Sequence, residues 1–527
     1  MTGKFTNRRA LVIPLFLIYL GLILYTAWVS DDGFITFRSI ENFMHGYGLL
    51  FNVGERVQTF THPLWFFLQS SFYLLTRLFD SPFGLNKLFY GNIVLSLSLS
   101  LLTIALYSFK VARSSQIAIA GLLILCLSKA FIDYSTSGLE NPLSHFLALC
   151  FFWLFLRKEK EGAYFVTGLS LLACLVALNR LDTVLIFSPA LLLVFWQSPN
   201  KLKTIVSMFI GFLPLVVWEL FSLFYYGTPF PNTASAKLDI GIPTFLLLKQ
   251  GAHYFLNSLR LDTITLVVIL FSVSLAIFSR NLRQISVAVG IGLYLCYVLY
   301  IGGDFMSGRY FSFPLLVAVV LLSTAEIKSP LVYGGSLIAI LAIGLLPFFT
   351  TIERRPTYGQ NRENNLVFLD NYKIADERLV YADRTGLIVA IQGDSPKVIY
   401  SQDEWTFSAG YPREVDVVGA MGLNGYRDGP NIHVIDVNGL ADPLIARMPL
   451  EDAQNWRIGH FHHIIPDGYE ETLSSGTNMI QDVNVALFYD KLSYVVKGPL
   501  WDWDRIVEIW NLNTGKYNYL VENITAE

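Results

Sequence analysis

The sequence predicts a polytopic α-helical membrane protein that ends in a smaller α/β domain. Of its 527 residues, 53% are hydrophobic and only 15% are charged, an apolar share typical of repeated bilayer spans. Long apolar runs recur up to about residue 350, and beyond that point they shorten to the length of β-strands. The formal net charge of −3 argues against nucleic acid as the main partner.

The first apolar run, 10–29, is predicted to be an uncleaved membrane span. Basic residues precede it, as they precede the apolar core of a signal peptide. No small-residue cleavage site follows, however, and the acidic residues Asp31 and Asp32 do. A retained span is therefore the better interpretation.

Loop charges decide how many runs cross the membrane. If every run were a span, Lys110, Arg157, Lys201 and Arg280 would lie outside, against the positive-inside rule. Removing 63–79, which starts with Pro and contains Gln and Ser, corrects every later loop, so we predict an interfacial helix there. About eleven spans remain, with a cytoplasmic N-terminus. They are 10–29, 88–109, 116–132, 143–156, 163–178, 183–196, 204–225, 263–279, 285–301, 310–325 and 330–350.

This topology predicts a transmembrane domain over 1–350, with an outer loop at 30–87, and a soluble outer domain over 351–527. The inner loops are short and basic, whereas the outer segments carry nearly all of the unusual polar sequence, which suggests an outward-facing site. The outer domain is expected to have mixed α/β structure. Its predicted strands are "KVIY", "NIHVIDV", "VALFY" and "LSYVV". The four cysteines lie inside apolar runs and are interpreted as packing residues.

Asp31 and Asp32 stand at the end of the first span. A carboxylate at the edge of the hydrocarbon is costly unless it is solvated, paired or functional. Boundary marking is one interpretation of this pair. The other interpretations are a general base that takes a proton from a hydroxyl, or oxygen ligands of a metal ion.

The same outer loop contains Arg38 and Arg56, whose planar guanidinium groups suit phosphate. His62 is a further candidate for phosphate binding or proton transfer. A loop histidine with a satisfied hydrogen bond is an equally good interpretation of it.

Three further outer junctions carry charge. Glu140 lies in "YSTSGLENP", and Arg180 and Asp182 lie in "ALNRLDTV", where a mutual ion pair is the alternative to a functional role. Asp304 and Arg309 lie in "YIGGDFMSGRYFSFP". We expect the charged junctions to converge on a cavity that opens outward.

These motifs also carry a family resemblance. "SDDGFITFR", "GYGLLFNVGERVQTFTHPLW" and "SGLENPL" resemble the GT-C superfamily of membrane glycosyltransferases. "GGDFMSGRYFSFP" and "DVNGLADPLIARMP…WRIGHFHHIIPDGY" narrow the resemblance to the terminal β-(1→2) arabinofuranosyltransferase family, which also includes the flagellar motor control protein ZomB. The resemblance covers essentially the whole chain.

The resemblance implies an inverting transfer of a sugar from a polyprenyl-phosphate donor to an envelope glycan acceptor. It places the protein in the bacterial inner membrane with a periplasmic C-terminal domain. Asp31 or Asp32 would be the catalytic base, and a divalent cation is left open as a cofactor. The residues implied for the donor phosphate are Arg180, Arg309, Arg56 and His62, and those for the rest of the substrate are Arg38, Glu140, Asp182 and Asp304.

Two other functions compete with this one. The flagellar branch implies a membrane protein that sets the direction of motor rotation, with or without enzymatic activity. A transporter is a weaker alternative, because transporters place ionisable groups near mid-membrane and here they gather at one face. The aromatic residues of the C-terminal 489–519 segment either stack on an acceptor glycan or pack the domain core, and the core is the preferred interpretation.

Overall fold

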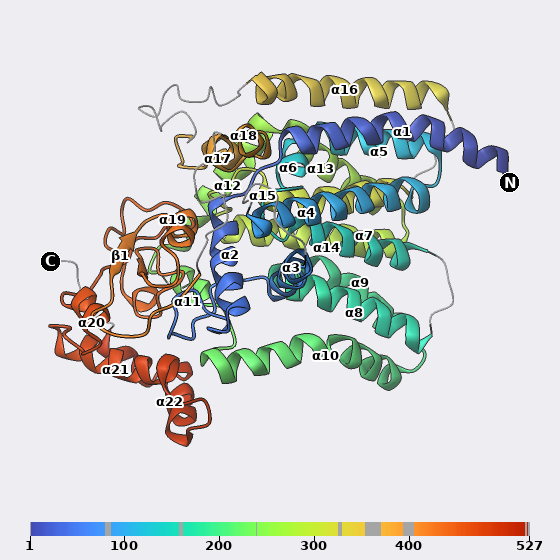
Figure 1. The fold of residues 1–527 in the computed structure, drawn as a ribbon. Helices are drawn as coiled ribbons and strands as arrows, with labels where there is room; N and C mark the ends of the chain where they lie inside the picture. Colours follow the sequence, from blue (N-terminus) through green and yellow to red (C-terminus); the bar gives the residue numbers. More distant parts are fainter. Residues whose placement is uncertain are drawn as a thin grey trace. The chain divides into compact units, whose positions relative to one another are not determined.

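The computed structural model describes residues 2–78, 86–157, 162–238, 240–324, 329–353, 370–393, 405–521 and 524. Over these residues the chain is mostly helical (Figure 1) and forms two compact units, each assembled from separate segments of sequence. Unit 1 consists of Met1–Ser30, Asn92–Leu215 and Thr244–Ser395. Unit 2 consists of Asp31–Gly91, Val216–Pro243 and Pro396–Glu527. The domain boundary at residue 350 stays a prediction.

Unit 1 is built from long helices that run side by side (Figure 1). Within it α14 packs against α9, α15 packs against α7 and α13, and α5 packs against α1 and α16. The helices are α1 (Thr2–Tyr25), α5 (Ser115–Leu127), α6 (Lys129–Asp133), α7 (Asn141–Leu156), α8 (Ala163–Asn179), α9 (Val184–Gln197), α12 (Thr244–Leu261), α13 (Thr263–Phe278), α14 (Leu282–Tyr300), α15 (Arg309–Leu322), α16 (Pro330–Glu353), α17 (Glu377–Thr385) and α18 (Leu387–Gln392), together with most of α4 (Lys87–Leu106) and α10 (Lys201–Tyr226).

Several of these helices have the apolar character of membrane spans. By length and composition, Lys87–Val111, Lys201–Tyr226 and Leu282–Tyr300 are each sufficient to cross a bilayer, and the bent pair α12 and α13 has the character of a broken span or a re-entrant loop. Shorter apolar helices make up most of the remaining predicted runs. The predicted spans therefore fall on helices, with 116–132 divided between α5 and α6, as expected for a membrane protein, while the number of spans stays a prediction.

The bend between α12 and α13 is 110° and is centred on Asp262. The buried Asp262 carboxylate accepts hydrogen bonds from the Ala130 amide (2.7 Å) and from the hydroxyls of Ser128 and Thr265. Helix α12 lies between the predicted spans 204–225 and 263–279, in a stretch for which no helix is predicted. Polar residues such as Lys249 interrupt its apolar pattern and conceal it.

Unit 2 contains a small β-α-β element. Strands β1 (Val415–Val418) and β2 (His433–Asp436) pair in parallel, and α19 (Met421–Asp428) forms the crossover between them. The core of the unit is built mainly around β2 and the C-terminal helices. The other helices of unit 2 are α2 (Asp31–Met44), α3 (Pro63–Thr76), α11 (Asn232–Lys237), α20 (Tyr469–Ser475), α21 (Val483–Lys497) and α22 (Trp503–Asn513).

Two predicted strands are wrong. "VALFY" and "LSYVV" are consecutive parts of the single helix α21, whereas "NIHVIDV" contains β2 as predicted and "KVIY" lies outside the described residues. The buried side chains Val485, Phe488, Leu492 and Val496 recur every three or four residues, which is a helical period. The Asp482 carboxylate caps the helix by accepting from the amides that begin it.

Candidate active site

Three of the four charged junctions converge within unit 1. The Arg180 guanidinium donates to both oxygens of Asp182, at 2.9 and 3.1 Å, and to Glu140 Oε1 at 3.2 Å. Arg309 lies 3.7 Å from Glu140 Oε1 and 3.7 Å from Asp304 Oδ2. Helix ends far apart in sequence thus bring five predicted site residues into one charge cluster, and all five side chains are largely buried.

The two arginines are held differently. Arg180 forms close hydrogen bonds with Asp182, so the ion pair considered for these residues is confirmed, and its guanidinium also stacks over the Tyr310 ring at 4.3 Å. The Arg309 contacts with Glu140 and Asp304 are longer than hydrogen bonds. Arg309 Nη1 also donates to Met306 Sδ at 3.7 Å.

Residues 375–385, which include α17, contact the loop that carries Asp304 and the chain just before Asp31. Ala375 forms a β-bridge with Met306, next to Asp304 in the chain. Further along, the Val29 amide donates to Thr385 O (3.3 Å) and the Thr385 hydroxyl donates to Val29 O (2.5 Å). Between these contacts Arg378 Nε donates to Asp133 at 2.7 Å. The segment thus fixes the residues that lead into Asp31 as well as the loop that carries Asp304.

Asp31 itself belongs to unit 2, where it caps α19. Its two carboxylate oxygens accept hydrogen bonds from the amides of Gly422 and Leu423, both at 2.9 Å. Amides in the first turn of a helix lack partners within the helix, and a carboxylate is their preferred acceptor. Asp31 therefore joins α2 to α19 across 391 residues of sequence. Asp32 is the next residue of α2 and is only partly buried.

Gly422 provides a test of this join. A Cβ atom at this position would lie 1.9 Å from the Asp31 carbonyl oxygen, so α19 would have to move away from α2. We expect Gly422→Ala to destabilise the protein by about 1–3 kcal/mol, measured as a lower thermal unfolding midpoint in detergent. A Cβ at Gly419 meets no atom within 4 Å, so Gly419→Ala is the matched control. Equal midpoints for the two variants would contradict the contact.

Arg38 and His62 lie in unit 2 with most of their polar atoms engaged there. Arg38 is fully buried and donates to the carbonyl oxygens of Phe51, Gly425 and Ile432, and burial lowers its pKa to about 9. His62 Nε2 lies 2.9 Å from the Thr36 hydroxyl, which matches the loop histidine with a satisfied hydrogen bond. These contacts stabilise unit 2, and the substrate roles of both residues stay predictions.

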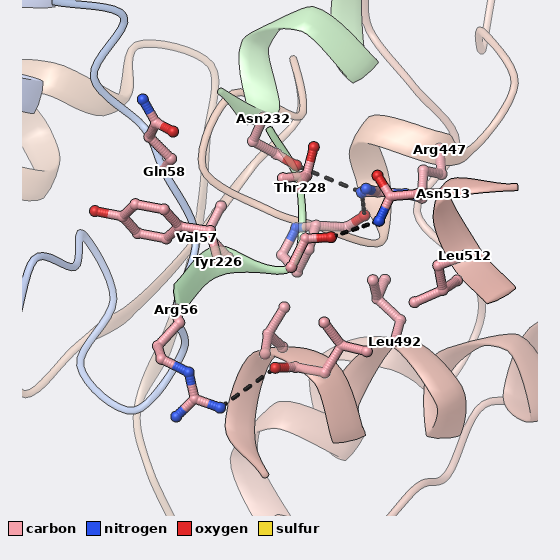
Figure 2. Close-up of a pocket in the computed structure, with 14 residues that line it drawn as sticks. Arg56, Val57, Gln58, Tyr226, Thr228, Asn232, Arg447, Leu492, Leu512 and Asn513 are labelled. Carbon is pink, nitrogen blue, oxygen red and sulfur yellow. Dashed lines mark hydrogen bonds between the residues drawn. The ribbon is translucent and has the colours of Figure 1, made fainter. Parts of the chain in front are cut away.

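Arg56 lines a pocket of unit 2 (Figure 2). Its guanidinium donates to the carbonyl oxygens of Val495 and Gly498 at the end of α21. Figure 2 shows Arg447 on the opposite side of the pocket, where it donates to Pro443 O at 2.6 Å. Both guanidinium groups thus bind the chain's own carbonyl groups, and the role of Arg56 in phosphate binding stays a prediction.

Asp442, in the "NGLADPL" motif, is a buried acid that the sequence analysis did not single out. Its carboxylate accepts from the Leu444 and Ile445 amides, both at 2.9 Å, and from the Tyr469 hydroxyl at 2.9 and 3.0 Å. Burial, followed by the charge of Glu55, raises the pKa of Asp442 to about 7. The position of Asp442 in a motif, next to a Pro, was the signal in the sequence that could have identified it. Its contact with Tyr469 could not be predicted, because that residue is distant in the chain.

This pKa predicts a pH dependence of stability. The Asp442 carboxyl has a pKa of about 3.8 in the unfolded chain and about 7 in the folded protein, so folding favours its protonated form. The stability that comes from this difference is fully present below about pH 4. As the pH rises to about 7 this stability is lost, and the free energy of unfolding falls by up to about 4 kcal/mol. Asn keeps the acceptor oxygen and stays neutral. We therefore expect Asp442→Asn to raise the unfolding midpoint above that of the unmodified protein at pH 8 and to leave it nearly unchanged at pH 4. Exposed Asp467→Asn is the control, and equal pH profiles for all three proteins would contradict the assignment.

Among residues 2–78, 86–157, 162–238, 240–324, 329–353, 370–393, 405–521 and 524, no group of three or more His, Cys, Asp or Glu side chains has the arrangement of a metal site.

The fold and the charge cluster define a largely helical protein of the membrane type whose charged residues gather at helix ends. No family model matches the chain. Two curated relatives are named terminal beta-(1->2)-arabinofuranosyltransferase. The protein from Mycobacterium tuberculosis is 25% identical over 84% of this chain and 81% of its own length. The protein from Corynebacterium glutamicum is 25% identical over 82% of this chain and 72% of its own length. The resemblance to these arabinofuranosyltransferases is therefore confirmed.

Proposed function

We propose that this chain is a GT-C glycosyltransferase of the bacterial inner membrane. It transfers an arabinofuranose-like sugar from a polyprenyl-phosphate donor to an envelope glycan acceptor at the outer face. The observation that carries the proposal is the charge cluster of unit 1, in which Arg180 and Arg309 meet around Glu140. The two relatives named arabinofuranosyltransferase support the same reaction class.

The cluster has the chemistry that a sugar phosphate requires. The Arg309 guanidinium provides charge-assisted hydrogen bonds to the phosphate oxygens, which gain negative charge as the phosphate leaves. The carboxylates of Glu140, Asp182 and Asp304 accept hydrogen bonds from sugar hydroxyls. Arg180, held by Asp182, positions Glu140 through its contact of 3.2 Å.

In the reaction, the acceptor hydroxyl oxygen attacks the anomeric carbon while the bond from that carbon to the phosphate oxygen breaks. The electron pair of this bond leaves on the polyprenyl phosphate, and a carboxylate takes the hydroxyl proton. We assign the base to Asp32, one of the two acids for which the family resemblance implies this role, while Asp31 caps α19 with both carboxylate oxygens. Asp31 is then a positioning residue, and attack by a single acceptor on the side opposite the phosphate inverts the anomeric centre.

The proposed topology follows from the loop charges. About eleven spans place the N-terminus in the cytoplasm and residues 351–527 in the periplasm, with the helix-end charges at the outer face. In this arrangement Asp31 and Asp32, which follow α1 in the chain, lie near the outer boundary of the membrane.

Deletion of the gene tests the proposed function. We expect the envelope glycans of the deletion strain to lose a terminal pentose that returns on complementation with the unmodified protein but not with Asp32→Asn. An unchanged glycan profile together with altered motor reversals would overturn the proposal and favour flagellar motor control. Both relatives are named as arabinofuranosyltransferases and not for a role in motility.

A further inference from the structure

Helix α22 exposes an apolar stripe. Trp503, Ile506, Val507 and Trp510 follow the spacing i, i+3, i+4, i+7 and so share one face of the helix. Their exposed fractions are 73%, 37%, 41% and 71%, and Trp501, just before the helix, is 87% exposed. The prediction that the aromatic residues of 489–519 pack the domain core is wrong for these three tryptophans, although it holds for Tyr489.

The opposite face of α22 is fixed to the end of α10. Arg505 is fully buried and donates to the carbonyl oxygens of Phe224 (2.8 Å) and Tyr225 (2.9 Å) in the last turn of α10. Carbonyl groups in the last turn of a helix have no partner within the helix, so Arg505 caps α10. The Trp501 ring packs on Phe224 with centroids 4.8 Å apart. All of these contacts lie within unit 2.

Helix α10 is one of the helices that are long and apolar enough to cross a bilayer. Near its C-terminal end Val216, Val217, Leu220 and Leu223 are exposed, as expected for side chains that face lipid. The apolar stripe of α22 is therefore held at the point where a spanning helix leaves the hydrocarbon. Tryptophan is enriched at this depth, because its ring is apolar and its N–H reaches the polar headgroups.

We propose that the stripe formed by Trp503, Ile506, Val507 and Trp510 inserts into the headgroup region of the leaflet at which α10 ends. Its occupant is a zwitterionic phospholipid surface, because the charge beside the stripe consists of the acidic Asp504 and of Glu508 paired with Lys491 at 2.9 Å, which gives no excess of positive charge for anionic lipid. A glycan is disfavoured as the occupant, because Ile506 and Val507 separate the two rings of the helix and supply no hydrogen bonds to hydroxyls. This inference does not depend on the glycosyltransferase activity.

A spin label on Val507→Cys tests the insertion in the full chain reconstituted in phosphatidylcholine nanodiscs. The exposed Cys296 is first replaced by Ala. Power saturation with oxygen and with a water-soluble nickel chelate then reports the depth of the label. We expect an oxygen-to-nickel accessibility ratio roughly tenfold higher for Val507→Cys than for Glu471→Cys, an exposed position on α20, because oxygen concentrates in lipid.

Equal accessibility ratios for the two positions would overturn the proposal. The proposal would also be overturned if Val507→Cys in detergent became shielded from nickel only after addition of a soluble arabinan oligosaccharide. That outcome would identify a glycan site. Broadening of the spectrum that disappears on dilution with unlabelled protein would identify a second copy of the chain as the occupant and would equally overturn it.

Discussion

Replacement of Asp32 by Asn is expected to lower kcat about 100- to 10,000-fold, the contribution of a well-placed general base. Asn has nearly the same shape but cannot take the proton of the acceptor hydroxyl. The measurement is transfer of labelled sugar by purified protein in nanodiscs, with donor and acceptor both saturating. The KM for the donor is expected to change little, because Asp32 acts on the acceptor rather than on the phosphate.

Asp31→Asn is the matched comparison for this variant. An Asn side chain keeps one acceptor oxygen, so one of the two amide bonds from Gly422 and Leu423 is lost. We expect this variant to lower the unfolding midpoint, by about 1 kcal/mol of stability. Full activity of Asp32→Asn, or a loss of activity confined to Asp31→Asn with normal stability, would contradict the assignment of the base.

Removal of the Arg309 guanidinium is expected to have the next largest effect. In Arg309→Met the donor phosphate loses its charge-assisted bonds, and Glu140 and Asp304 lose a neighbouring positive charge. We expect kcat/KM for the donor to fall at least about 100-fold. A cost in stability of about 3–5 kcal/mol is expected as well, because the remaining carboxylates are buried.

A conservative variant separates these two effects. Arg309→Lys keeps the positive charge, so its unfolding midpoint should stay near that of the unmodified protein, but it loses the planar fork that matches a phosphate. We expect its KM for the donor to rise about 10-fold with little change for the acceptor. The exposed Arg427→Lys is the control. An unchanged KM for the donor in Arg309→Lys would show that Arg309 does not bind the phosphate.

The helical part of the fold was predictable, because long apolar runs leave few alternatives to helices whose backbone groups are satisfied internally. The structure of segments with mixed polarity was harder to predict. Helix α12 was missed because Lys249 and other polar residues interrupt its pattern, and α21 was read as two strands because each half is a short apolar run. Its three-to-four-residue period and the cap at Asp482 were the better signals.

Part of the candidate site was predictable for a similar reason. Charged residues at helix ends are costly at a membrane boundary unless they meet partners, and Glu140, Arg180 and Arg309 do meet. The partners of Asp31 could not be predicted, because Gly422 and Leu423 lie about 390 residues further along the chain. For the same reason, the carbonyl contacts of Arg38 and Arg56 are invisible in a single sequence.

The most direct test of the central claim is a donor comparison with the purified protein. Nanodiscs that contain the protein receive the acceptor glycan and either polyprenyl-phosphate arabinofuranose or a nucleotide-linked form of the same sugar. We expect product only from the lipid-linked donor, with one free polyprenyl phosphate released for each sugar transferred. Transfer from the nucleotide-linked donor, or no transfer from the lipid-linked donor by a folded protein, would contradict the proposed function.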